Sequence, residues 1–183
     1  MTTKAINQNR IKKETEVTSI QETLSNANIC VFAEYRGLDV ESMSKLRSQV
    51  REMGGQVKVS KNTLTRRASA QAGLSFPDEL LTGPIATIST SDDSSKVCKS
   101  LLRYAKENES LQIKGGVFEN QYIDLKMVKQ LASLPSKETL IILMDHNDGL
   151  SEIVEEIASN IGYRNIQILK NGVFGWKKAG FFL

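Results

Sequence analysis

The chain has 183 residues, of which 40% are hydrophobic, 6% aromatic and 25% charged, and its formal net charge is +3. This composition is typical of a globular protein and excludes collagen-like chains, mucin-like stalks and general disorder. The two cysteines, Cys30 and Cys98, lie in apolar segments and are expected in the core of a protein from a reducing compartment. With one histidine, His146, and no Cys/His cluster, neither a zinc site nor a Cys–His nucleophile pair is expected.

Positive charge is concentrated in the front of the chain. Residues 1–75 contain 12 Lys/Arg against 7 Asp/Glu, whereas residues 76–139 contain 8 against 9 and residues 140–183 contain 4 against 5. Such asymmetry indicates an anionic partner on one side, although a merely solvated basic surface explains it equally well. No apolar run could span a bilayer, and the first residues lack the apolar stretch of a signal peptide. The expected location is therefore the cytoplasm.

Apolar periodicity predicts helices and strands in alternation over the first three quarters of the chain. Helices are expected at about residues 13–26, 39–54, 62–73, 91–104 and 125–134, and strands at 29–33, 56–60, 85–88, 111–118 and 122–123. Asp39 and Asn62 are expected to cap their helices. The fold class is therefore α/β, with a mixed sheet flanked by helices.

The last part of the chain differs in character from the rest. Residues 135–139 are the expected linker between a domain at 1–134 and a C-terminal appendage at 140–183. The appendage should be a strand (140–144), a polar loop (145–149), a helix (150–161), a strand (166–169) and a short helix (174–178). In its first helix Ile153, Ile157 and Ile161 are expected to face inward, and Gly162 to end the helix. A unit of this size is marginal alone and should pack on a neighbour.

The segment from residue 58 to 67 is the strongest candidate site. Strand alternation places Val59 in the core and Lys58 in solvent, Lys61 lies at the strand-to-helix turn, and Arg66 and Arg67 lie one turn into the helix. A helix start exposes unpaired amides and the positive end of its dipole, so these cations could bind phosphate. The alternative is a capped helix with a solvated basic face.

A second candidate is the loop that follows the first strand. Arg36 could reach a phosphate there, and Gly37 would allow a close backbone approach. The alternative is an ordinary strand-to-helix turn. Asp145, His146 and Asp148 are better explained as a solvated polar loop than as metal ligands, because adjacent side chains in a turn rarely converge. We expect no metal and no cofactor.

Four segments occur together in an order that identifies a family. They are Tyr-Arg-Gly-Leu at 35–38, the run KVSKNTLTRRA at 58–68, Gly83-Pro84, and Lys-Gly-Gly-Val at 114–117. Over about residues 10–140 the chain resembles ribosomal protein L10, also called uL10, the protein at the base of the stalk of the large ribosomal subunit. The resemblance implies a non-enzymatic, structural protein of the cytoplasmic ribosome, with an organellar ribosome as the alternative.

The resemblance also implies partners and RNA contacts. Members of this family bind the GTPase-associated region of large-subunit rRNA close to ribosomal protein L11. Their C-terminal helix recruits dimers of the acidic stalk protein, which contact translational GTPases. The contacts implied at matching positions are Arg36, Gly37, Lys58, Lys61, Asn62, Thr63, Arg66 and Arg67, with Arg10, Lys12 and Lys13 as further contacts.

The tail departs from this family, because the long apolar helix expected after residue 139 is not recognisable. Residues 140–183 weakly resemble the end of a rhodanese-like domain at Gly162, Tyr163, Arg164, Asn165, Ile166, Leu169, Gly172 and Trp176. Rhodanese chemistry needs a thiolate, but Asp145 occupies the corresponding position and the tail has no cysteine. Sulfur transfer is therefore not expected. The remaining alternative function is that of a ribosome-assembly factor with the same fold.

Overall fold

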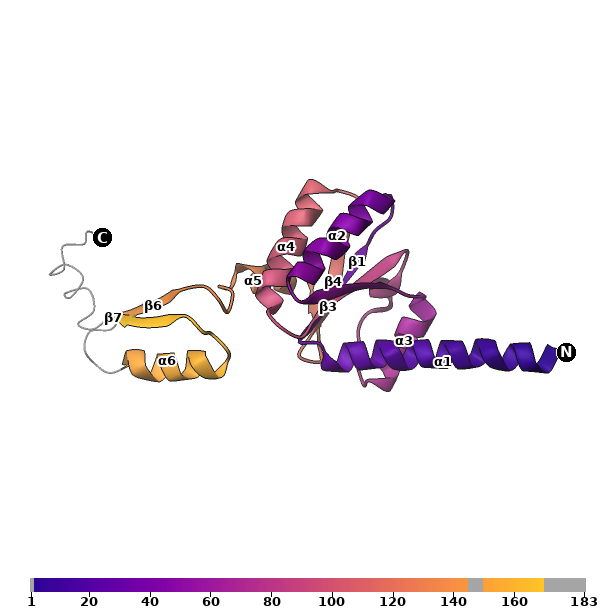
Figure 1. The fold of residues 1–183 in the computed structure, drawn as a ribbon, viewed down its shortest axis with the longest axis horizontal. Helices are drawn as coiled ribbons and strands as arrows, with labels where there is room; N and C mark the ends of the chain where they lie inside the picture. The colour runs from indigo at the N-terminus through magenta and orange to yellow at the C-terminus, as the bar shows by residue number, and fades with distance from the viewer. Residues whose placement is uncertain (1, 145–149, 170–183) are drawn as a thin grey trace. The chain divides into compact units, whose positions relative to one another are not determined.

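A computed structural model describes residues 2–144 and 150–169 of the chain. The chain divides into two compact units, residues 1–134 and residues 135–183 (Figure 1). Within the described residues no helix is both long and apolar enough to cross a membrane.

The first unit is a five-stranded sheet with helices on both faces. Its strands lie in the order β2-β3-β1-β4-β5, and all four pairs are antiparallel. The elements in chain order are α1 (Thr2–Asn26), β1 (Ile29–Glu34), α2 (Val40–Glu52), β2 (Gly55–Val59), α3 (Asn62–Gln71), the 3-10 helix η1 (Asp78–Leu81), β3 (Ile85–Thr90), α4 (Ser94–Glu107), β4 (Gln112–Phe118), β5 (Gln121–Asp124) and α5 (Leu125–Ser133).

The α/β class is confirmed, but the sheet is antiparallel where a mixed sheet was expected. β1 and β2, which α2 connects, both run antiparallel to β3 and therefore point in the same direction. They do not pair with each other, because β3 lies between them. The helical crossover thus joins two parallel strands that are not neighbours.

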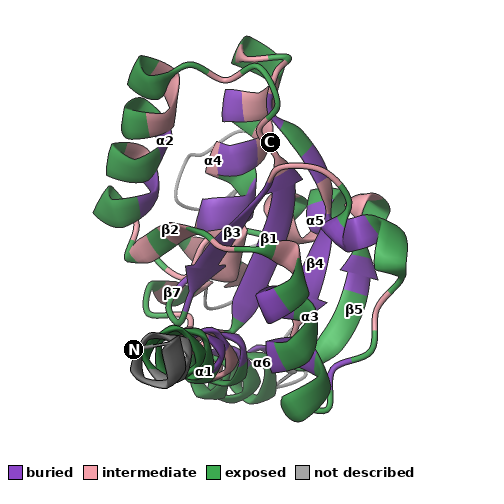
Figure 2. Cartoon of the chain, turned by 90° about the vertical axis from the view of Figure 1, so that its right-hand side faces the viewer, coloured by how far each residue is buried: buried purple, intermediate pink, exposed green. Residues whose placement is uncertain are grey.

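Alternating residues of β1 belong to two separate cores. Val31 and Ala33 face α2, α4 and α5, whereas Cys30 and Phe32 face α1, α3 and η1. Figure 1 shows α2 and α4 on one side of the sheet and α1 and α3 on the other. The central strands β1 and β3 are almost continuously buried as a result (Figure 2).

Both cysteines are core residues of this first unit, as expected. Burial raises the pKa of the Cys30 thiol to about 12 and likewise raises the pKa of the Cys98 thiol to about 12. Both thiols are therefore protonated and unreactive at neutral pH. This assigns them to packing rather than to chemistry.

The second unit is a strand–helix–strand unit, also as expected. β6 (Ile141–Met144) pairs in parallel with β7 (Ile166–Leu169), and α6 (Leu150–Asn160) connects them. Gly162 follows the helix with a φ of +97°, a left-handed conformation that favours glycine at a helix end. The segment expected as a linker is bonded to this unit, since the Arg164 amide donates to the Lys137 carbonyl at 3.1 Å.

The inward isoleucine face predicted for this helix is wrong. Ile153, Ile157 and Ile161 are 55%, 55% and 61% exposed, whereas Ser151 and Ala158 are buried. Small side chains let a helix approach its strands closely, so the small-residue face packs and the isoleucine face remains outside. The loop expected at 145–149 and the short helix expected at 174–178 lie outside the described residues.

Candidate nucleic-acid interface

The turn between β2 and α3 leaves the start of α3 open. Lys61 is the N-cap residue, with φ −65° and ψ 129°, and its side chain makes no capping hydrogen bond. Its carbonyl accepts from the amides of Leu64 and Thr65, at 2.9 and 3.1 Å, so the amides of Asn62 and Thr63 precede the first intrahelical bonds. Lys61 and Thr63 are exposed. Amides and the helix dipole here favour an anion.

Asn62 is not the helix cap that the sequence suggested. Its side-chain amide instead donates to the carbonyl of Gly83 at 2.8 Å. Gly83 has a φ of +88°, and a Cβ there would lie 3.1 Å from Glu34 Oε1 and 3.4 Å from the Arg36 guanidinium. The Gly83-Pro84 turn thus joins the two candidate segments, which are far apart in sequence.

Arg36 is held at this turn and remains open to solvent. Its Nε lies 3.0 Å from Glu34 Oε1, and Lys114 Nζ lies 2.7 Å from Glu34 Oε2. The Arg36 side chain is 74% exposed, whereas that of Glu34 is only 13% exposed. The hydrogen bond from Lys114 is the main cause that lowers the pKa of Glu34. Gly37 follows with a φ of +85°.

Lys114 is a member of this cluster that sequence reasoning missed. Phe32 pairs with Gly115 and Ala33 with Ile113, so Lys114 is the extra residue of a β-bulge. Bulges re-aim side chains, and this one places the Lys114 ammonium on Glu34. The available signal was the one cation, next to two glycines, in the strand expected at 111–118.

The two arginines of α3 are held differently. The Arg66 guanidinium lies 3.3 Å from Asp78 Oδ1 through Nε and donates to the Asp78 carbonyl at 3.1 Å. Arg67 is exposed. In the part of the chain that the structure describes, the side chains of Arg67 and Lys61 have no hydrogen-bond or ion-pair partner. The start of α3 therefore presents three cations: Arg66, which Asp78 orients, and Lys61 and Arg67, which have no partner among the described residues.

Lys58 was predicted to face solvent, but the structure places it elsewhere. It is half-buried, and its Nζ donates to Ser19 Oγ at 2.8 Å, because α1 covers this face of the sheet. Val59, predicted in the core, is 41% exposed at the end of β2. Val59 is the last residue of the edge strand β2, where the simple in-out alternation does not hold.

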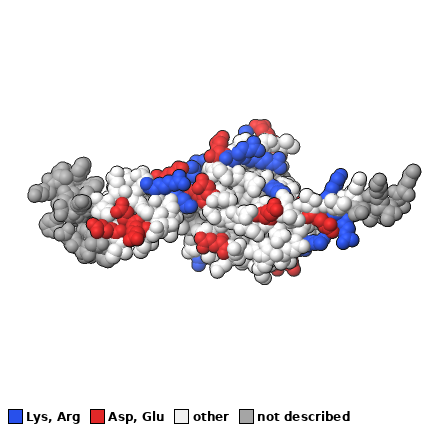
Figure 3. Space-filling model, turned by 60° about the horizontal axis from the view of Figure 1, so that its bottom comes forward, with Lys and Arg blue, Asp and Glu red and all other residues white. Residues whose placement is uncertain are grey.

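The N-terminal cations lie on the helix that packs against α3. Val17, Ile20 and Leu24 of α1 share a core with α3, while Arg10, Lys12 and Lys13 upstream are exposed. Arg10 Nε pairs with Glu14 Oε1 at 2.9 Å. Figure 3 shows basic side chains gathered over this part of α1. The α1 and α3 cations thus belong to the same side of the sheet, whereas Arg36 lies at the end of β1.

An α/β protein that presents such a surface has the features of a polyanion-binding protein. Within residues 2–144 and 150–169, no group of three His, Cys, Asp or Glu side chains could hold a metal ion. The comparison with known families is more specific. The model of the family Ribosomal protein L10 matches residues 8–106, and the chain belongs to this family of non-enzymatic proteins of the large ribosomal subunit.

Individual relatives agree with this family. The large ribosomal subunit protein uL10 of Staphylococcus epidermidis is 42% identical over 132 residues, which are 72% of this chain and 80% of that protein. The uL10 protein of Staphylococcus aureus is 43% identical over 132 residues with the same coverage. The resemblance found from the four sequence segments is therefore confirmed. The family model ends at residue 106, well before the second unit.

Proposed function

We propose that this chain binds the GTPase-associated region of large-subunit rRNA and forms the base of the ribosomal stalk. The observation that carries the proposal is the exposed cation group at the start of α3. Lys61 and Arg67 are free within the described residues, and Arg66 is oriented by Asp78. Arg36 and Gly37, joined to α3 through Asn62 and the Gly83 turn, extend the same surface.

The arrangement favours phosphate contacts that position a folded RNA. Arg36 and Arg66 are each fixed by one carboxylate, so less side-chain entropy is lost when they bind. Arginine presents a planar fork that matches two phosphate oxygens. The amides at the start of α3 add donors that carry no sequence information. Selectivity would then come from the shape of the RNA rather than from base sequence.

Salt dependence of RNA binding tests the proposal directly. We expect the triple substitution Lys61→Ala, Arg66→Ala and Arg67→Ala to flatten the plot of log Kd against log salt by about 0.7–0.9 for each phosphate that the variant no longer neutralises. The probe is a fragment of large-subunit rRNA that contains the GTPase-associated region, bound to the full chain.

A matched control removes the same charge from the opposite face of the sheet. Lys45, Arg47 and Arg51 are exposed on α2, and replacing all three by Ala should shift affinity slightly with a nearly unchanged slope. Equal effects of the two triple variants, or no effect of the α3 variant, would show that the assigned surface is wrong.

The stalk-base role adds two partners, ribosomal protein L11 and the acidic stalk-protein dimers. The long C-terminal helix that recruits these dimers in the family is not recognisable here, so mixing the full chain with the acidic dimers tests this partner: a stable complex in gel filtration supports it, and separate elution contradicts it. Co-sedimentation with mature large subunits separates a resident ribosomal protein from an assembly factor of the same fold. A resident protein remains with mature particles, whereas an assembly factor is absent from them.

A further inference from the structure

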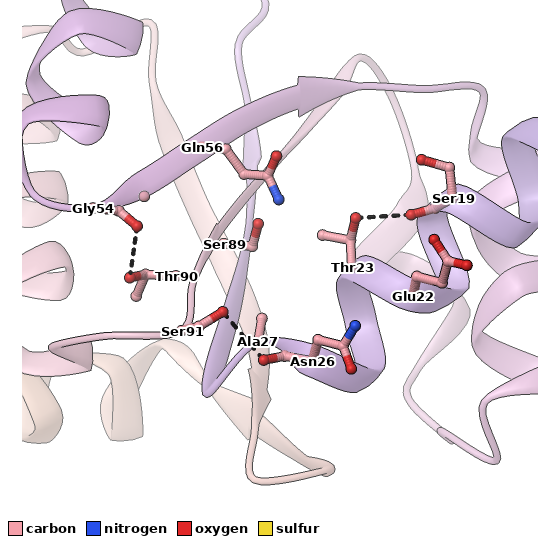
Figure 4. A pocket seen from close by; sticks show the side chains of 11 residues that line it. Ser19, Glu22, Thr23, Asn26, Ala27, Gly54, Gln56, Ser89, Thr90 and Ser91 are labelled. Atoms are coloured by element: carbon pink, nitrogen blue, oxygen red, sulfur yellow. Dashed lines mark hydrogen bonds between the residues drawn. The ribbon is translucent and has the colours of Figure 1, made fainter.

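We propose that a polar pocket on the first unit receives the base of an unpaired nucleotide of the bound RNA, an inference that rests on the function proposed above. The pocket has a volume of about 320 Å³ and lies between the last turns of α1, the start of β2 and the end of β3 (Figure 4). Its size is at the lower end of the range of ligand pockets, which suits one small polar group.

Several hydroxyl groups around the pocket are already used within the protein. Thr23 Oγ1 donates to the Ser19 carbonyl at 2.8 Å, and Thr90 Oγ1 donates to the Gly54 carbonyl at 3.3 Å. Ser91 Oγ donates to the Asn26 carbonyl at 3.1 Å. The Thr90 and Ser91 bonds join different walls of the pocket, from the end of β3 to the turn before β2 and to the end of α1.

Besides the Asn26 side-chain amide, which lines the pocket on the helix side, three other polar side chains are available to a ligand. The Glu22 carboxylate, the Gln56 amide and the Ser89 hydroxyl line the pocket, and none has a hydrogen-bond partner among the described residues. Figure 4 shows Glu22 on the helix side and Gln56 and Ser89 on the strand side. The ligand therefore meets a charged acceptor and the Asn26 amide on the helix side, and an amide and a hydroxyl on the strand side.

This set of groups selects a nucleobase over a phosphate. A carboxylate repels phosphate but accepts hydrogen bonds from the exocyclic amino group of a base. The amide and the hydroxyl can each donate and accept, and so can satisfy the mixed edge of a base. The lining has no aromatic side chain, so recognition is by the base edge rather than by stacking. Unpaired bases in loops and bulges present such edges.

The position of the pocket fits a nucleotide of an RNA bound to the basic surface. Lys58 Nζ bonds to Ser19 Oγ at the pocket wall, which places an ammonium group beside it. Ser19 follows Lys13 by six residues on α1, a distance of about 9 Å along the helix at 1.5 Å per residue. A base in the pocket would thus have cations near the phosphates that flank it.

The substitution Glu22→Ala, which removes both the charge and the hydrogen-bond acceptor, gives a test in which the sign of the effect is decisive. Removing a negative charge from an RNA-binding protein normally strengthens binding, because repulsion is relieved. If Glu22 accepts a hydrogen bond from a base, the substitution should instead lower the affinity for the same rRNA fragment by about fivefold or more. The matched control is Glu16→Ala, which removes the same charge from α1 at a residue outside the pocket.

A second variant tests the strand side of the pocket. Gln56 is exposed on edge strand β2, so Gln56→Ala should leave the fold intact and also weaken binding several-fold. The loss caused by Gln56→Ala should be the same at every salt concentration, because this substitution removes neither a charge nor a phosphate contact. Tighter or unchanged binding by Glu22→Ala, or unchanged binding by Gln56→Ala, would overturn the pocket assignment. The salt slope of the α3 triple variant tests the underlying RNA-binding function separately.

Discussion

Gly116 is the position where one added methyl group should damage the fold most clearly. It lies in β4, between Val31 of β1 and Ile123 of β5. A Cβ at this residue would lie 2.4 Å from the carbonyl oxygen of Cys30 and 3.2 Å from the Val31 Cα. Both obstacles are backbone atoms, so no side-chain rotation can relieve the contact.

The cost of Gly116→Ala can be worked out from this geometry. Reaching an ordinary contact of 3.4 Å requires β1 and β4 to separate by about 1 Å, but β1 is also bonded to β3 and β4 to β5. Stretching two ladder hydrogen bonds costs about 0.5–1.5 kcal/mol each. Overpacking of a tight core adds about 1–3 kcal/mol. We expect the free energy of unfolding of the first unit to fall by about 3 kcal/mol.

Thiol labelling measures this unit alone. Cys30 and Cys98 are its buried thiols, and residues 135–183 contain no cysteine, so the labelling rate reports opening of the first unit. A decrease of about 3 kcal/mol raises that rate roughly 100-fold, since 1.4 kcal/mol is a factor of ten.

Gly73→Ala is the control for backbone strain without a collision. Gly73 has a φ of +71°, and a Cβ there would have nothing within 4 Å. Left-handed backbone costs a non-glycine residue about 1 kcal/mol, so labelling should rise only about fivefold. If Gly116→Ala labels no faster than Gly73→Ala, the argument from the close approach of β1 and β4 is wrong.

Three further substitutions test a helix cap, an ion-paired carboxylate and the hydrogen bond to the Gly83 turn. Asp39→Ala removes the N-cap bond of α2, which is 2.7 Å long, and should lower the free energy of unfolding in urea by about 1 kcal/mol. Glu34→Gln should flatten acid unfolding, because the pKa of Glu34 is lowered from 4.5 and the stability that it adds above that pH is lost as the pH falls; a pH series of urea midpoints measures it. Asn62→Ala removes the 2.8 Å bond to Gly83 and should weaken RNA binding several-fold with an unchanged salt slope, measured as for the α3 variant.

The sequence predicted most elements of the first unit because their ends are marked by local signals. The strand expected at 29–33 is β1 (Ile29–Glu34), and the helix expected at 39–54 is α2, capped by Asp39 as predicted. The pairing of strands was not predictable, because strand order depends on contacts between distant segments. α1 begins earlier than expected, since its first half has no apolar stripe to reveal it.

The sequence predicted the cations of the candidate site but not the groups that hold them in place. The charged segment 58–67 and Arg36 are visible in the sequence, whereas the carboxylates that hold two of them are not. Asp78 lies 12 residues from Arg66 on a 3-10 helix, η1, between the helix expected at 62–73 and the strand expected at 85–88. Lys114 reaches Glu34 only because a bulge shifts the register of β4, and register shifts leave no pattern in a single sequence.

The second unit shows why helical periodicity alone does not identify a buried face. Periodicity correctly placed Ile153, Ile157 and Ile161 on one side of α6. It does not tell whether this side faces the strands or the solvent. The opposite side carries Ala158, whose small side chain lets the helix approach the parallel pair β6–β7 closely, and this side is buried. A two-stranded sheet is too narrow to cover both sides of a helix, so its packing selects the side with the better fit. Burial of a helix face is therefore decided by the shape of its neighbour as well as by hydrophobicity.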